Sequence, residues 1–154
     1  GAKTVPLTDG RMTRFWMTLE ESVDLVMKSL EWAEGGEILV PKVPSMKMED
    51  VARAIIPDCK IEIVGIRPGE KLHETLISED ETRNTKVVDG IYVILPQFFE
   101  RKRLYKKYMD CPNIPDGRAF RSDSNDLWLN EEQLRNMIGG FDMEVKTGNE
   151  VSSI

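Results

Sequence analysis

Apolar residues recur at helical spacing after Thr18, and this is the clearest periodic pattern in the chain. Thr18 is followed three residues later by Glu21, a pair that is typical of the capping box that begins a helix. Gly35 and Gly36 provide a stop signal after the last apolar position. The pattern predicts an amphipathic helix in which Met27, on the apolar side, fills the core. The apolar positions are Leu19, Val23, Val26, Met27, Leu30 and Ala33.

Two further helices are expected later in the chain. Ser45 precedes a second helix, which has apolar residues along one side and is ended by Pro57. Asn130 opens a last short helix that continues through Ile138. The apolar side of the second helix consists of Met48, Val51, Ala52, Ile55 and Ile56.

Three short apolar runs, at 37–41, 60–64 and 91–96, are predicted to be strands. The middle run alternates apolar and polar residues, which is typical of a half-buried strand. Strands that alternate with helices along a chain indicate an α/β fold.

Composition limits the classes of protein to consider. The chain has 154 residues, of which 40% are hydrophobic and 31% charged, so we expect one core: a domain over 1–138 and a loose tail over 139–154. The formal net charge of -6 argues against nucleic acid as the main partner. No apolar run approaches the roughly 18 residues needed to span a membrane, which favours a cytoplasmic protein. Cys59 and Cys111 lack metal-ligand spacing, so no metal site is predicted.

The segment from Gly65 to Glu74 carries the candidate chemistry. It follows the predicted strand at 60–64, and ligands favour such strand ends in α/β sheets. Arg67 offers a planar fork of donors that suits a diphosphate. Glu70 can accept hydrogen bonds from the paired hydroxyls of a ribose. The alternative is that Arg67 and Glu70 form a solvated pair beside a turn.

Together with several other segments, this motif resembles the C-terminal part of an extended short-chain dehydrogenase/reductase. Specifically, it is similar to the substrate-binding lobe of the inverting UDP-N-acetylglucosamine 4,6-dehydratases of polysaccharide biosynthesis. The resemblance covers roughly residues 3 to 138, and several segments in the right order are more specific than one motif. The segments are 7–19, 40–48, 65–74, 122–125 and 128–129.

The resemblance implies roles for individual residues. Arg14 and Arg67 match the arginines that reach the UDP diphosphate in that family, and Glu70 matches the acidic residue that contacts the ribose. Leu7 and Thr8 lie in the segment that supplies backbone groups near the uracil ring. His73 also matches a family position, but a lone histidine beside a glutamate is more often structural than catalytic.

The resemblance also shows what the chain lacks. The family uses NADP, but this sequence has no Gly-x-Gly-x-x-Gly turn, and no tyrosine is followed four residues later by a lysine. We therefore expect no catalytic residue and no bound NADP in this chain alone. The chain does not begin with methionine, and we expect it to be part of a longer enzyme whose N-terminal Rossmann half is its partner.

Two classes of function remain open from the sequence. The first is the UDP-sugar-binding part of a 4,6-dehydratase, or of a related nucleotide-sugar epimerase. The second is a free-standing, non-catalytic UDP-binding or interaction module. A homo-oligomer that covers exposed apolar surface is possible under either hypothesis.

Overall fold

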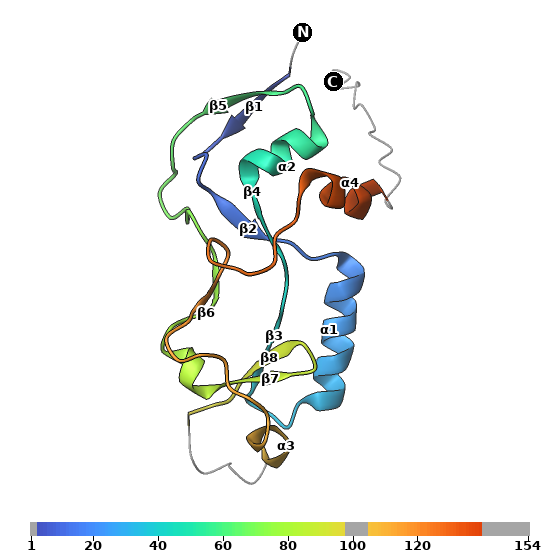
Figure 1. The fold of residues 1–154 in the computed structure, drawn as a ribbon, viewed down its shortest axis with the longest axis vertical. Coiled ribbons are helices and arrows are strands. Elements are labelled where there is room, and N and C mark those ends of the chain that lie inside the picture. Colours follow the sequence, from blue (N-terminus) through green and yellow to red (C-terminus); the bar gives the residue numbers. More distant parts are fainter. Residues whose placement is uncertain (1–2, 98–104, 140–154) are drawn as a thin grey trace, which may run out of the picture.

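The helix predicted after Thr18 is present as α1, Leu19–Trp32, in a computed structural model that describes residues 3–97 and 105–139 (Figure 1). Both bonds of its capping box are formed. The Glu21 N–H donates to the Thr18 hydroxyl at 3.1 Å, and the Thr18 N–H donates to the Glu21 carboxylate at 2.8 Å. Gly36, just past the end of α1, has a φ of 103°, a conformation that favours glycine.

The second and last predicted helices are confirmed as α2, Met48–Ile55, and α4, Glu131–Gly139. Asn130 caps α4, because its side-chain oxygen accepts the Gln133 N–H at 2.8 Å. The helix signal at Ser45 was wrong in detail, since Ser45–Lys47 forms strand β4. The sequence did not predict the short helix α3, Lys106–Met109, or the 3₁₀ turn η1, Glu81–Asn84.

The three predicted strands are confirmed, with slightly shorter bounds, as β3, Ile38–Pro41, β5, Lys60–Ile63, and β8, Ile91–Ile94. Five further strands, all of two to four residues, carry too short a pattern to be recognised. They are β1, Thr4–Leu7, β2, Thr13–Phe15, β6, Thr75–Ile77, β7, Thr85–Val88, and β9, Phe120–Arg121.

The strands form several small sheets along an elongated molecule (Figure 1). β1 and β5 pair in parallel, whereas β2 with β4 and β6 with β9 pair antiparallel. β8 lies between β3 and β7 in an antiparallel sheet at the other end of the molecule. Within the described residues the fold is therefore mixed α/β, with one parallel pair.

The core is divided between the two ends of the molecule. At one end α2 and α4 pack together on β4, through Met46, Val51, Ala54 and Leu134. Ala54 is buried there in place of the predicted Ile55, which is 49% exposed. Toward the other end the Phe120 ring packs against those of Phe15 and Tyr92, with centroid separations of 4.8 and 5.2 Å.

The apolar side of α1 does not face this core. Met27 is 61% exposed, so the prediction that it fills the core was wrong. The helical pattern was correct, but periodicity shows only that a helix has an apolar side, not what covers that side.

The predicted tail lies almost entirely outside the described residues. Gly139 is the last residue of α4, and residues 140–154 are not described. None of the described helices is long and apolar enough to cross a membrane.

Candidate functional site

Two strand ends lie side by side at the candidate site. β1 and β5 run in parallel with Leu7 opposite Ile63, and the Val64 N–H donates to the Leu7 carbonyl oxygen at 2.9 Å. The chain after Leu7 and the chain after Ile63 therefore leave the sheet at the same edge. The prediction that the 65–74 motif follows the end of a strand is confirmed.

Thr8 and Glu70 meet just beyond these strand ends. The Thr8 hydroxyl donates to one carboxylate oxygen of Glu70 at 3.1 Å. The other carboxylate oxygen accepts the backbone N–H of Arg67 at 3.2 Å, and the Glu70 N–H donates back to the Arg67 carbonyl at 3.1 Å. Gly69 closes this turn with a φ of 82°, which strains any other residue. The Glu70 carboxylate is thus held at the junction of two segments.

Arg67 is exposed, and its guanidinium has no hydrogen-bond or ion-pair partner within residues 3–97 and 105–139. An exposed guanidinium without a partner among the described residues keeps all its donors available for an anion.

Arg14 reaches the same loop but is already bound to it. Its Nη1 donates to the carbonyl oxygens of Thr13 at 2.7 Å and Leu72 at 3.2 Å, and its Nη2 donates to that of Lys71 at 2.9 Å. Its Nε lies 3.6 Å from a Glu74 carboxylate oxygen. Arg14 therefore joins β2 to the residues that directly follow Glu70, a structural role that the sequence did not indicate.

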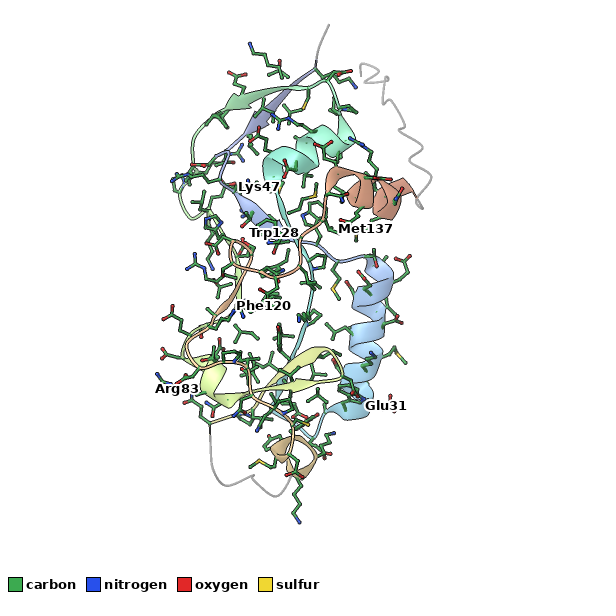
Figure 2. All side chains as sticks on the ribbon, in the orientation of Figure 1. Glu31, Lys47, Arg83, Phe120, Trp128 and Met137 are labelled. Atoms are coloured by element: carbon green, nitrogen blue, oxygen red, sulfur yellow. The ribbon has the colours of Figure 1, made fainter. Side chains whose placement is uncertain are left out.

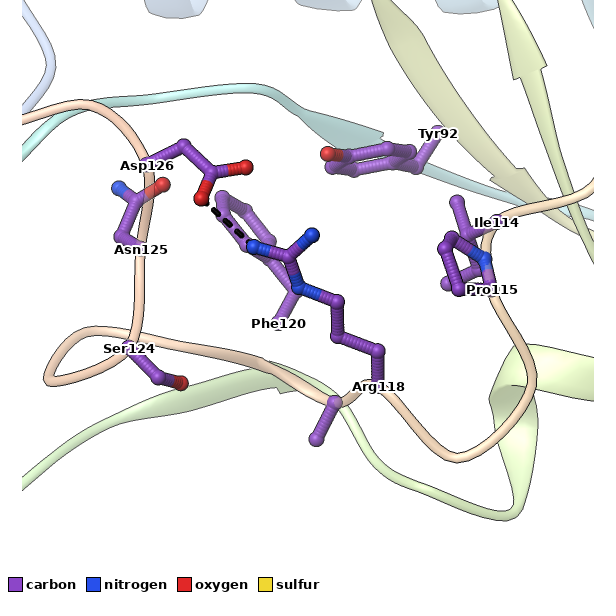
Figure 3. Close-up of a pocket in the computed structure, with 9 residues that line it drawn as sticks. Tyr92, Ile114, Pro115, Arg118, Phe120, Ser124, Asn125 and Asp126 are labelled. Carbon is purple, nitrogen blue, oxygen red and sulfur yellow. Dashed lines mark hydrogen bonds and ion pairs between the residues drawn. The ribbon is translucent and has the colours of Figure 1, made fainter.

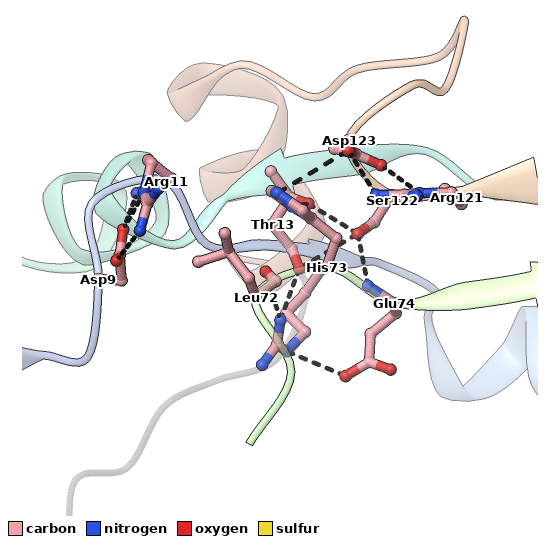
Figure 4. A network of polar contacts seen from close by, with 10 residues as sticks. Asp9, Arg11, Thr13, Leu72, His73, Glu74, Arg121, Ser122 and Asp123 are labelled. Atoms are coloured by element: carbon pink, nitrogen blue, oxygen red, sulfur yellow. Dashed lines mark hydrogen bonds and ion pairs between the residues drawn. The ribbon is translucent and has the colours of Figure 1, made fainter. Parts of the chain in front are cut away.

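A polar network joins Thr13, a neighbour of Arg14, to His73, Glu74 and Ser122 in the interior (Figure 4). The Thr13 hydroxyl lies 2.8 Å from the Nδ1 of His73 and 2.7 Å from the Ser122 hydroxyl. Ser122 is fully buried and also accepts the Glu74 N–H at 2.9 Å. His73 is thus a hydrogen-bonded structural residue in this network. Sequence reasoning missed Thr13 and Ser122 as partners, because a contact across 109 residues leaves no local pattern.

Asp123 borders the network, 3.8 Å from the Nε2 of His73. Burial is the largest single effect and raises the pKa of its carboxyl. The paired hydrogen bonds from Arg121, at 2.9 and 3.0 Å, a backbone hydrogen bond and the nearby positive charges together outweigh burial and lower the pKa overall. Asp123 is therefore ionised at neutral pH and faces the imidazole as a negative charge.

Asp9 and Arg11 form a similar pair in the turn between β1 and β2 (Figure 4). The Arg11 side chain donates to Asp9 at 2.7 and 3.0 Å, and the Arg11 N–H donates at 2.8 Å. These hydrogen bonds lower the pKa of the Asp9 carboxyl from 3.8 to about 2. The pair fixes the turn that joins Thr8 to Thr13.

A small, partly open pocket lies elsewhere, between Tyr92, Phe120 and the ion pair of Arg118 with Asp126, whose atoms are 2.6 Å apart (Figure 3). Its volume of about 60 Å³ is small beside the roughly 300–1,000 Å³ of small-molecule sites. Thr8 and Glu70 are half-buried and do not line this pocket. No cluster of metal ligands occurs within the described residues.

The described residues do not fit the NADP that the resemblance implies for the parent family. A dinucleotide site needs a strand that passes through a glycine-rich turn into a helix. β1 is the first strand of the described parallel pair. It passes through the turn at Asp9 and Met12 into another strand, β2, and not into a helix. β5 passes into the loop that contains Arg67.

Comparisons with known proteins show which family the chain belongs to. Over 151 residues the chain is 40% identical to the inverting UDP-N-acetylglucosamine 4,6-dehydratase of Campylobacter jejuni serotype O:2, covering 90% of this chain and 43% of the relative. Over 96 residues it is 36% identical to the UDP-glucose 4-epimerase of Rickettsia bellii, covering 60% of this chain and 28% of the relative.

The structure is similar to the X-ray structure of Pen from Bacillus thuringiensis, with a TM-score of 0.71 and 29% identity, over 89% of this chain and 41% of that one. The chain thus spans less than half the length of these relatives, and its fold is that of part of a short-chain dehydrogenase/reductase. The family model described as polysaccharide biosynthesis protein matches residues 1–96. With well over half of its residues matched, the chain belongs to this polysaccharide biosynthesis protein family.

Proposed function

We propose that this chain is the UDP-sugar-binding part of a nucleotide-sugar 4,6-dehydratase that acts on UDP-N-acetylglucosamine in glycan biosynthesis. The observation that carries the proposal is the Thr8 to Glu70 hydrogen bond of 3.1 Å, with the Arg67 guanidinium in the same turn and unpaired among the described residues. A carboxylate for ribose hydroxyls and a guanidinium for the diphosphate then lie within one turn.

In this proposal the chain contributes binding and orientation. Arg67 holds the diphosphate, Glu70 accepts the ribose hydroxyls, and the backbone of Leu7 and Thr8 borders the uracil. Arg14 holds the loop and lies beside the diphosphate. The hexose is positioned against catalytic groups of a Rossmann half outside this chain, where NADP binds.

The dehydratase is favoured over an epimerase by the extent of the match. Similarity to the C. jejuni dehydratase runs over 151 residues, whereas similarity to the UDP-glucose 4-epimerase of Rickettsia conorii, at 43% identity, runs over 83. The match to the R. conorii epimerase covers 51% of this chain.

An NMR titration of the 154-residue chain with UDP tests the proposal. Half of the cleft is outside the chain, so we expect weak binding, with amide shifts gathered at Thr8, Arg67 and Glu70. Arg67→Ala should remove a charged hydrogen bond of about 1.5–3 kcal/mol and abolish the shifts. Lys60→Ala, an exposed charge on the adjoining β5, is the matched control and should leave them unchanged. Shifts that survive Arg67→Ala would exclude the assigned role.

A further inference from the structure

The most apolar side of α1 faces away from the rest of the described chain. Its apolar residues are spaced three or four apart and therefore form one stripe along the helix. Figure 2 shows side chains projecting from the outer side of α1, where Glu31 is labelled. The exposed fractions in the stripe are 69% for Leu19, 53% for Val23, 57% for Val26, 61% for Met27 and 76% for Leu30.

The side of α1 that is partly covered is less apolar than this stripe. It carries Ser22, Leu25, Ser29 and Trp32, all of which are half-buried. The two serine hydroxyls donate to carbonyl oxygens within the same segment, Ser22 to Thr18 at 2.9 Å and Ser29 to Leu25 at 2.7 Å. The helix thus turns both serines inward, beside Leu25 and Trp32, and turns most of its aliphatic side chains outward, which is the reverse of a helix on the surface of a complete domain.

The helix is fixed in this orientation at both ends. Thr18 caps its first turn. Just before the helix, the backbone N–H of Trp16 donates to the Pro44 carbonyl oxygen at 2.9 Å. At the other end the Tyr108 hydroxyl donates to the Trp32 carbonyl at 2.9 Å, and Tyr105 donates to that of Gly35 at 2.7 Å. The stripe therefore stays exposed unless another surface covers it, and contiguous apolar patches of this kind mark interfaces.

We infer that the α1 stripe docks on an apolar surface of the part of the longer enzyme that this chain does not span. The inference rests on the proposed function, because it takes the chain to be one lobe of such an enzyme. The C. jejuni relative contains more than half its length outside the match, and so does the chain of Pen. That additional chain is a partner that every copy of a complete enzyme would hold at high local concentration.

Charge disfavours a second copy of this chain as the occupant. An acidic edge runs along one side of the stripe, because Glu20, Asp24 and Glu31 are four and seven residues apart and so lie on the same side of the helix. All three are exposed. In a twofold antiparallel pair of α1 helices these acidic edges face each other, which is repulsive. The covering surface should instead be apolar in its centre and carry Lys or Arg opposite this edge.

Thiol labelling tests the inference on proteins that fold. Val26→Cys is made in this chain with Cys59 and Cys111 replaced by serine, and a cysteine is placed at the aligned position of the intact C. jejuni dehydratase. We expect a water-soluble maleimide to label the 154-residue chain at least ten times faster than the intact enzyme. Equal labelling rates would overturn the inference. Slow labelling of the intact enzyme that becomes fast on dilution would also overturn it, because the cover would then be another subunit.

Binding in trans gives a second measurement. The remainder of the C. jejuni dehydratase, produced without the matched region, should bind this chain, and the double change Val26→Ser with Leu30→Ser should weaken binding at least tenfold. Lys28→Ser, on the same helix but off the stripe, is the control and should bind as the unchanged chain does. Equal weakening by the control, or concentration-dependent dimers that the double change abolishes, would overturn the inference. Neither the labelling rate nor the binding in trans depends on UDP. A failure of the docking inference can therefore be told apart from a failure of the proposed UDP-binding function.

Discussion

The Thr8 hydroxyl donates a hydrogen bond of 3.1 Å to the Glu70 carboxylate, although 62 residues separate them. The contact exists because β1 and β5 pair in parallel and release their following segments at one edge. It fixes one carboxylate oxygen, while the Arg67 N–H holds the other. A carboxylate held in this way keeps lone pairs for a ligand without having to be ordered on binding, which lowers the cost of recognition.

Glu70→Ala should remove the preference for a ribose with both hydroxyls. If Glu70 accepts from these hydroxyls, the unchanged chain binds UDP more tightly than 2′,3′-dideoxy-UDP, by about 1–3 kcal/mol. In Glu70→Ala the two ligands should bind equally weakly. NMR titration of both proteins with both ligands measures the difference. An unchanged difference in the variant would show that Glu70 does not read the ribose.

Thr8→Val should destabilise the fold by about 0.5–1.5 kcal/mol, because it removes one hydrogen bond and keeps the side-chain shape. Thr4→Val is the matched control, since Thr4 is an exposed residue of β1, the strand that leads to Thr8. Urea denaturation followed by circular dichroism measures both. If the two variants unfold at the same urea concentration, the contact between Thr8 and Glu70 contributes nothing to stability.

Much of the site was predictable where the signal is local. The capping box of Thr18 and Glu21, the strand before Gly65 and the turn at Gly69 all depend on residues within a few positions of one another. Such patterns follow from helix and strand geometry and from the freedom of glycine, so they can be read from one sequence.

The remainder depends on contacts between distant segments. The Arg14 guanidinium binds the carbonyls of Lys71 and Leu72, and any residue type at those two positions would offer the same oxygens. The residue types at positions 71 and 72 therefore do not indicate that Arg14 holds the loop. The exposure of Met27 was unpredictable for a related reason, since what covers a helix is decided by the tertiary structure.

Arg14→Ala should destabilise the fold by about 2 kcal/mol, because charged hydrogen bonds to three carbonyls are lost. Arg14→Lys should recover only part of this, because one ammonium cannot span the positions that the planar guanidinium reaches. Arg53→Ala is the control: Arg53 forms an exposed ion pair with Glu49 at 2.6 Å, which is worth no more than about 1 kcal/mol. Chemical denaturation of the three variants checks the order, and an Arg14→Lys protein as stable as the unchanged chain would contradict it.

The Asp9 carboxyl should titrate with a pKa of about 2, below its ordinary 3.8. A lowered pKa in the folded state contributes stability above the unfolded value, and this contribution is lost as the pH falls from 3.8 through about 2. Arg11→Ala removes the hydrogen bonds that cause the shift and should return the pKa toward 3.8. NMR of the side-chain carboxyl carbon measures both values. A midpoint near 3.8 in the unchanged chain would mean that the Arg11 pair is absent in solution.

Ser122→Ala should destabilise the fold, because Ser122 connects Thr13 to Glu74 in the polar network. Its buried hydroxyl contacts the Thr13 hydroxyl at 2.7 Å and accepts the Glu74 N–H at 2.9 Å, so the change removes one hydrogen-bond partner from each of these two groups. That loss costs about 1–3 kcal/mol. Ser124→Ala, at an exposed serine two residues later, should cost less than about 0.5 kcal/mol.

The two serine variants also test whether the network positions the loop that follows Glu70. Thr13 and Glu74 both contact Arg14, so loosening Ser122 should shift the amide resonances of Lys71 and Leu72 as well as its own neighbours. A purely local packing defect would change the unfolding midpoint and leave those two amides in place. Because Arg67 and Glu70 lie directly before them in the chain, displaced amides at Lys71 and Leu72 together with weaker UDP binding would connect a residue near the C-terminal end of the described chain to the proposed site.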